Sequence, residues 1–224
     1  MAQTELAPSE TPEAEGHAPV HGHADTNTGT TNTKLAMWVF LSSECIFFGA
    51  FISTYLLYRG RSPANTPQPK DVYNIPFTLV TSFILLMSSL TMVLALAAVE
   101  NKDKPGWAGP GWGGRILESS KLWLLATAIL GAGFLCYQAF EFTSFVHEGL
   151  TIKTNLFGSS FFTLTGFHGA HVTAGVLWLL TLLAIDVKRG LGPRDALLVD
   201  ISALYWHFVD VVWIAIFTLV YLIR

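Results

Sequence analysis

The chain has 224 residues, of which 51% are hydrophobic and only 13% are charged. Soluble globular domains are typically about 25% charged, so this composition excludes an ordinary soluble domain and favours an integral membrane protein. The formal net charge is -3, and the basic residues form no stripe that would neutralise phosphates. We therefore expect no nucleic-acid partner.

A hydrophilic segment, Met1 to Thr33, precedes the apolar part of the chain. Met1 and Leu6 are its only Leu, Ile, Met, Phe, Trp or Tyr residues. Such a segment cannot bury enough apolar surface to offset its chain entropy, so we expect a disordered tail. Its histidines offer weak metal ligands at most; they are His17, His21 and His23.

Five long apolar segments follow this tail, separated by polar links that contain Gly and Pro. A helix needs roughly 20 apolar residues to cross the hydrocarbon core of a bilayer, and unpaired backbone groups are not tolerated there. We predict an all-α, polytopic membrane protein in which residues 34–224 form a bundle of five transmembrane helices. The expected spans are approximately 35–58, 76–99, 122–146, 159–185 and 201–223.

The distribution of Lys and Arg predicts the orientation of these spans. With the amino terminus in the cytoplasm, eight basic residues lie on the cytoplasmic side and five on the opposite side. Cytoplasmic loops carry an excess of Lys and Arg, so we expect a cytoplasmic amino terminus and a periplasmic carboxyl terminus.

Ionisable side chains inside the spans are the most informative residues. Near the middle of a span each costs about 2.5–3.5 kcal/mol on insertion scales, so each needs a partner or a function. They are Glu44, Glu141, His168, His171, His207 and Asp210. Glu44 lies ten residues into the first span. Its carboxyl is either a proton relay or a structural group that bonds to another span or to a lipid head group.

Helical spacing predicts which polar side chains share a face in the third and fourth spans. Gln138 and Glu141 are three residues apart, and we expect them to cross-link helices. His168 and His171 have the same spacing and are expected to reach a neighbouring helix. Small residues nearby are expected to allow close helix contact; they are Gly166, Gly169, Ala170 and Ala174.

In the fifth span, Trp206 precedes His207, and Asp210 follows three residues later. This spacing predicts a structural dyad in which a charge-assisted hydrogen bond lowers the cost of burying both His207 and Asp210. The two cysteines, Cys45 and Cys136, lie 91 residues apart inside apolar segments. We expect inert core thiols rather than a metal or redox pair.

The chain contains few of the side chains that bind haem and copper. Three span histidines are too few for the two haems and the copper of a haem-copper catalytic subunit. A dinuclear copper site would need two nearby cysteines beside a His and a Met, which this sequence lacks. A single haem held by His207 and either His168 or His171 is the metal-binding alternative.

Two segments carry a resemblance to a known family. Residues 161–172 read Phe-Phe-Thr-Leu-Thr-Gly-Phe-His-Gly-Ala-His-Val, and residues 205–213 read Tyr-Trp-His-Phe-Val-Asp-Val-Val-Trp. They closely resemble the two hallmark segments of subunit III of the haem-copper respiratory oxidases, best known as cytochrome c oxidase subunit III. Weaker similarities lie at residues 43–48, 138–142 and 158–162, so the resemblance covers Lys34 to the carboxyl terminus.

The chain also departs from that family. Longer members have seven spanning helices, and this chain resembles only the last five. In those members a cleft between the first two helices and the others holds phospholipids, so here the cleft must be absent or completed by another subunit. Asp200 and Phe142 stand where the family often has Glu and Tyr. The Gly- and Trp-rich loop 101–120 has no counterpart that we identify.

The resemblance implies a five-helix bacterial subunit III in the cytoplasmic membrane. Such a subunit carries no haem, copper or catalytic residue, and it packs against catalytic subunit I, other oxidase subunits and structural phospholipids. It sustains proton uptake and turnover stability in an oxidase that reduces dioxygen to water and pumps protons. The side chains that we expect to have buried polar, lipid-binding or structural roles are Glu44, Gln138, Glu141, His168, His171, Trp206, His207 and Asp210.

Other functions stay open at this stage. A quinol oxidase subunit III and the accessory protein of a nitric-oxide reductase are alternatives within the same superfamily, and span number does not separate them. Haem type, electron donor and membership of a larger respiratory assembly also stay open. A more distant alternative is an independent transporter or proton channel using Glu44, Glu141 and Asp210, although the spans show no obvious inverted repeat.

Overall fold

The computed structural model describes residues 31–59, 61, 75–104 and 106–223. The predicted all-α fold is confirmed in these residues, which contain five helices long and apolar enough to span a membrane. They are α1 (Asn32–Arg59), α3 (Ile75–Glu100), α5 (Ser120–His147), α6 (Leu156–Arg189) and α7 (Ala196–Ile216), which the π-helix η2 (Phe217–Leu222) continues. Residues 1–30 of the expected tail, including its histidines, lie outside the described residues.

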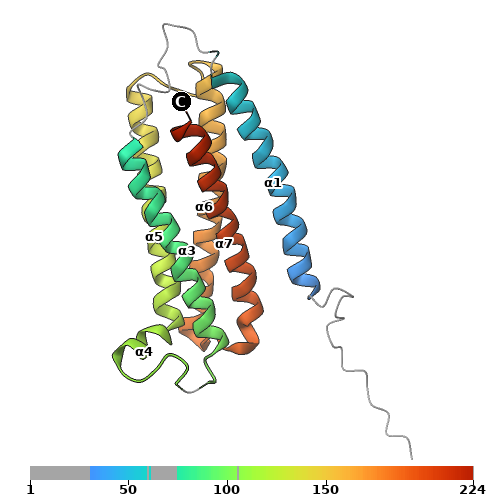
Figure 1. The fold of residues 1–224 in the computed structure, drawn as a ribbon, viewed down its shortest axis with the longest axis vertical. Coiled ribbons are helices and arrows are strands. Elements are labelled where there is room, and N and C mark those ends of the chain that lie inside the picture. Colours follow the sequence, from blue (N-terminus) through green and yellow to red (C-terminus); the bar gives the residue numbers. More distant parts are fainter. Residues whose placement is uncertain (1–30, 60, 62–74, 105, 224) are drawn as a thin grey trace, which may run out of the picture.

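Four helices form a ring, and the fifth is peripheral. α3 contacts α5 and α7, and α6 also contacts α5 and α7. α1 packs outside this ring, against α6 and α7 (Figure 1). The start of α1, the link from α3 to α5 and the link from α6 to α7 lie together at the lower end in Figure 1. The π-helix η2 lies at the upper end.

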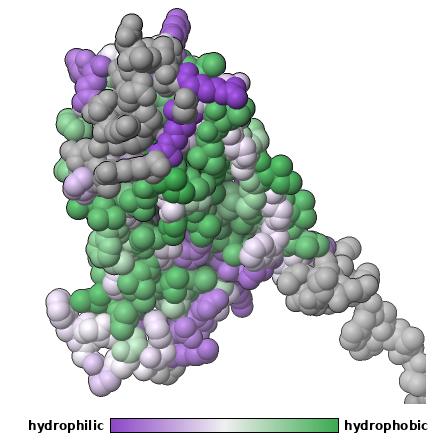
Figure 2. Space-filling model, turned by 45° about the horizontal axis from the view of Figure 1, so that its top comes forward, coloured by the Kyte–Doolittle hydropathy of each residue, from purple (hydrophilic) through white to green (hydrophobic). Residues whose placement is uncertain are grey.

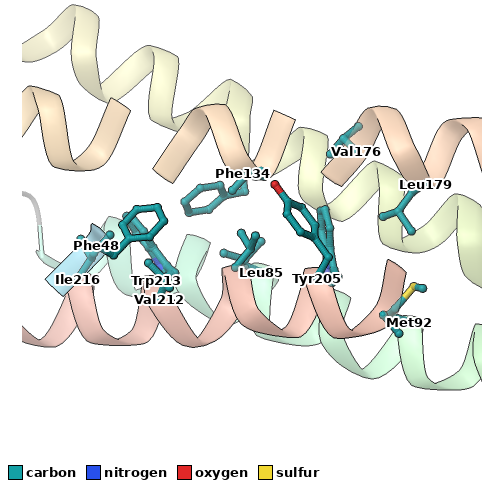
Figure 3. Close-up of a cluster of buried hydrophobic side chains, with 14 of the residues drawn as sticks. Phe48, Leu85, Met92, Phe134, Val176, Leu179, Tyr205, Val212, Trp213 and Ile216 are labelled. Atoms are coloured by element: carbon teal, nitrogen blue, oxygen red, sulfur yellow. The ribbon is translucent and has the colours of Figure 1, made fainter. Parts of the chain in front are cut away.

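Apolar side chains fill the interior of the ring. Leu85 and Met92 from α3, Phe134 from α5, and Leu179 from α6 lie in one cluster with Trp213 from α7 (Figure 3). Lipid tails are as apolar as these side chains, so close packing and interhelical hydrogen bonds, rather than transfer out of water, stabilise the contacts between helices.

Apolar side chains also cover much of the outside of the bundle. Figure 2 shows them across the middle of one face, with hydrophilic residues gathered mainly toward the two ends. Cys45 and Cys136 both lie on exposed parts of the helices. The prediction of core thiols is therefore wrong, because a spanning helix is apolar on its lipid-facing side as well as on its packed side.

Polar contacts at the two ends fix α1 and α7 together. At the lower end, Lys34 of α1 lies 2.6 Å from Asp200 of α7 in an ion pair. At the upper end, the hydroxyl of Tyr55 donates to the carbonyl of Val220 over 3.4 Å. The guanidinium of Arg59 donates to the carbonyls of Leu219 and Ile223. The peripheral helix is thus joined to the last span at both of its ends.

Two short elements complete the lower end. The helix α4 (Trp112–Leu117) interrupts the link between α3 and α5, which the sequence predicts only as a polar connection. The 3-10 turn η1 (Pro193–Asp195) precedes α7. Asp186, buried near the end of α6, accepts bonds from the Ser120 hydroxyl over 2.6 Å and the Leu191 amide over 2.8 Å. These bonds tie the start of α5 to the end of α6.

Candidate functional site

The carboxyl of Glu141 is the centre of a buried polar network. Its Oε1 accepts hydrogen bonds from the hydroxyls of Thr78 on α3, over 3.2 Å, and Tyr137 on α5, over 3.4 Å. Its Oε2 accepts a bond from the hydroxyl of Tyr221 in η2, over 3.1 Å. The prediction that Glu141 cross-links helices is confirmed, and it joins α3 and η2 to α5.

Gln138 cross-links α5 to α6. Its Nε2 donates to the backbone carbonyl of Thr165 over 2.6 Å. This close approach requires glycine on α6, because a Cβ at Gly169 would lie 2.7 Å from Gln138 Oε1. The prediction of a close contact at Gly169 is therefore confirmed. At Gly166 a Cβ would meet nothing within 4 Å. Ala170 and Ala174 are exposed, so the described part of the chain makes no close helix contact at these three positions, and their contacts stay a prediction.

A row of serines on α3 binds the aromatic and imidazole groups of α7. The indole Nε1 of Trp206 donates to Ser88 Oγ over 2.9 Å, and that of Trp213 donates to Ser82 Oγ over 2.9 Å. Between them, His207 Nδ1 bonds to Ser89 Oγ over 2.5 Å. These three bonds hold the hallmark segment of α7 against α3.

The predicted dyad of His207 and Asp210 does not form. Asp210 neighbours Ser89, but neither of its carboxyl oxygens has a hydrogen-bond partner in the described part of the chain. His207 bonds to Ser89 instead. The prediction of a His207–Asp210 hydrogen bond is therefore wrong: His207 Nδ1 bonds across to α3, and the Asp210 carboxyl accepts no bond from the imidazole.

Trp206 fills a slot between α5 and α6 that only glycine leaves open. A Cβ on Gly131 would lie 2.5 Å from Trp206 Cη2 and 2.8 Å from its Cζ2. A Cβ on Gly175 would lie 2.8 Å from Cε3 and Cζ3 of the same ring. The ring is fully buried. Trp206 therefore joins α7 to α5 and α6 by packing, and to α3 through Ser88.

His168 lies at the centre of the bundle among aromatic rings. Its ring stacks on Trp213, with centroids 4.9 Å apart and planes inclined by 25°. Phe134 contacts it edge to face, with centroids 5.8 Å apart. Within the described residues, neither ring nitrogen of His168 has a hydrogen-bond partner.

Glu44 and His171 meet where the peripheral helix packs on α6. Glu44 Oε2 lies 3.3 Å from His171 Nε2. His171 Nδ1 lies 2.8 Å from the carbonyl of Phe167, and since a carbonyl only accepts, Nδ1 carries a proton. The structural interpretation of Glu44, as a contact with another span, is confirmed; its relay role stays a prediction.

The three span histidines therefore have different neighbours. His171 faces α1, His207 faces α3, and His168 lies between Phe134 and Trp213. Among the described residues, no group of three or more His, Cys, Asp and Glu side chains is placed to hold a metal ion. The side chains from the hallmark segments are arranged to join helices.

Sequence reasoning missed the hydroxyl partners of this network. Each is a small or aromatic polar residue in an apolar span, and such residues hydrogen-bond across helices. That signal marks the spans in which they lie but does not identify their partners. They are Thr78, Ser82, Ser88, Ser89, Tyr137 and Tyr221.

The chain was compared with known proteins. It matches the family model described as cytochrome c oxidase subunit III over residues 15–223. It is 39% identical over 191 residues to the cytochrome c oxidase subunit 3 of Bacillus sp. (strain PS3), covering 85% of this chain and 86% of that protein. It is 37% identical to the quinol oxidase subunit 3 of Bacillus spizizenii, covering 87% and 88%. It is 36% identical to the cytochrome bo(3) ubiquinol oxidase subunit 3 of Pseudomonas aeruginosa, covering 93% of each chain.

Proposed function

The chain belongs to the cytochrome c oxidase subunit III family, and we propose that it serves a proton-pumping oxidase that takes electrons from cytochrome c and reduces dioxygen to water. Family membership confirms the resemblance of the two hallmark segments and makes the chain a multi-pass subunit of a haem-copper oxidase complex. The observation that carries the proposal is the similarity to cytochrome c oxidase subunit III, and the use of polar groups from the hallmark segments in contacts between helices supports a role without redox centres.

We propose that this chain binds no haem or copper and leaves catalysis to its partners. The arrangement of the ligands supports this role. A bis-histidine haem would need His207 and a second histidine on opposite faces of one porphyrin. Here His207 is bonded to Ser89 on α3, and His171 is paired with Glu44 on α1. His168 lies against the indole of Trp213.

We propose that the subunit packs directly on catalytic subunit I, together with phospholipid, and supports proton uptake and turnover stability. The apolar outer surface supports this proposal, since it suits lipid tails and neighbouring spans. A groove of about 480 Å³ between α3 and α7 is lined almost entirely by apolar side chains, including Leu79, Phe83 and Ile214. The groove fits an acyl chain. The Lys and Arg distribution supports a cytoplasmic amino terminus in the bacterial inner membrane.

We expect His207→Ala and Asp210→Ala to loosen the subunit from the oxidase or to shorten the active lifetime of the enzyme, without changing its haem spectrum. The first change removes the bond to Ser89 that holds α7 to α3. The amount of this chain per haem and the rate of activity loss during turnover measure the effect. Asp103→Ala, at an exposed position in a link, is the control. A lost haem signal would contradict the non-redox role.

A second prediction concerns the electron donor of the complex. The purified complex should oxidise reduced cytochrome c faster than quinol, because the matching family model and the Bacillus sp. (strain PS3) relative are of the cytochrome c oxidase type. The quinol oxidase relatives favour a second candidate, in which quinol is the better donor. A complex that consumes nitric oxide rather than dioxygen would contradict both. A haem-bearing partner of catalytic-subunit size, captured with this chain from mildly solubilised membranes, would exclude an independent transporter.

A further inference from the structure

The link between α3 and α5 has a defined shape. Gly106, Gly109 and Gly111 have φ angles of 76°, 83° and 100°, a region that favours glycine. Gly114 packs so closely on this turn that a Cβ there would lie 2.1 Å from the Gly109 carbonyl oxygen. The glycines fold the link back on itself and fix the position of α4.

The surface that α4 presents is both aromatic and basic. Trp112 is 80% exposed, and Arg115 is exposed one turn later on the same short helix. None of the ion pairs between described residues involves Arg115. Lys121, at the start of α5, is also exposed. The sequence of α4 contains no acidic residue, and the exposed Glu118 follows it directly, without forming an ion pair with Arg115.

The position of α4 is at one end of the transmembrane bundle. α3 ends at Glu100 and α5 begins at Ser120, so the link that carries α4 joins two spans at the same end of the bundle. In Figure 1, α4 projects sideways from the lower end of α5, at about the height of the turn between α6 and α7. In this view α4 extends to the side of the bundle, and a segment so placed at the end of two spans is suited to contact lipid head groups.

We propose that α4 is an interfacial anchor, in which the Trp112 indole lies among lipid head groups and Arg115 binds the phosphate of an anionic phospholipid. Indole rings favour the interface between bilayer and water, because one part of the ring is apolar and the N–H is polar. An unpaired guanidinium binds phosphate oxygens through two parallel hydrogen bonds. Together, the Trp112 indole and the Arg115 guanidinium favour contact with a lipid surface over exposure to bulk water.

Depth-dependent fluorescence quenching tests the position of Trp112. The full chain and Trp112→Phe are placed in nanodiscs of phosphatidylcholine with phosphatidylglycerol, and the difference between them isolates this tryptophan. We expect lipids brominated near the glycerol backbone to quench it at least twofold more than lipids brominated near the acyl-chain end. Quenching by aqueous iodide, without quenching by either lipid, would overturn the proposal.

A matched pair of charge reversals tests the role of Arg115. Arg115→Glu should reduce the enrichment of phosphatidylglycerol around the chain by at least about fivefold, since loss of the cation alone removes about 1 kcal/mol near an anionic surface and the new carboxylate adds repulsion. Lys153→Glu makes the same charge change at an exposed position at the other end of the bundle and should have no effect at this site. Equal losses in both variants would overturn the proposal.

The quenching measurement is then repeated with the assembled oxidase in the same nanodiscs. Quenching of Trp112 by the brominated lipids should persist in the complex. Its disappearance on assembly would show that another subunit covers α4, and would overturn the proposal without affecting membership of the oxidase family.

Discussion

Gly131→Ala should lower the thermal stability of the solubilised chain, although alanine is the better helix former. The added Cβ would lie 2.5 Å from Trp206 Cη2 and 3.1 Å from Val176 Cγ2. The indole cannot easily retreat, because Ser88 holds its N–H and Gly175 bounds its other side. Overpacking of this kind costs about 1–3 kcal/mol, and Gly131→Val should cost more. The temperature at which the solubilised chain loses helical circular dichroism measures the effect.

Gly133→Ala is the control on the same helix. A Cβ there would meet nothing within 4 Å. This variant should therefore be as stable as the natural chain, or more stable by up to about 1 kcal/mol from helix propensity alone. Adding Trp206→Phe to Gly131→Ala should restore part of the loss, since the smaller ring makes room. If Gly131→Ala and Gly133→Ala behave alike, the slot does not control packing.

Glu141→Leu should give the second large effect, by removing the acceptor that three hydroxyl groups share. The donors come from Thr78, Tyr137 and Tyr221, so the change loosens α3 and η2 from α5 together. Buried hydrogen bonds contribute about 0.5–1.5 kcal/mol each, and about 0.6 on average between membrane helices. We expect a total loss of about 1–3 kcal/mol, measured by the same thermal unfolding experiment.

Graded variants separate hydrogen bonding from side-chain size. Glu141→Gln keeps one carbonyl acceptor and should lose less stability than Glu141→Leu. Tyr221→Phe removes a single donor and keeps the ring, so its loss should be smaller still. Glu148→Leu, at the exposed end of α5, is the control and should be nearly neutral. A Glu141→Leu chain as stable as this control would show that the network does not hold the helices together.

The sequence alone indicated where the helices lie, because lipid imposes strict requirements on length and polarity. The predicted spans 35–58, 76–99, 122–146 and 159–185 each lie inside one helix, and 201–223 matches α7 with η2 to within a few residues. The two hallmark segments also indicated the family. In contrast, α4 was missed, because six residues rich in glycine carry no helical periodicity.

Tertiary structure decided how the polar side chains pair. Spacing along a helix correctly placed Gln138 and Glu141 on one face, but it also paired His207 with Asp210, which the structure does not. Spacing describes one helix at a time, whereas a buried donor bonds to the best-placed acceptor on any helix. Ser89 is that partner for His207, and it lies 118 residues away in the sequence.

Tertiary structure also decided which side chains face outward and which pack inside the bundle. Lipid accepts apolar side chains on every face of a span, so composition determined that residues such as Cys45 lie in the membrane, and only packing decided that Cys45 faces outward. Likewise, the sequence determined that Gly131 and Gly175 are small. Only the fold, which places the Trp206 ring between them, requires glycine at both positions.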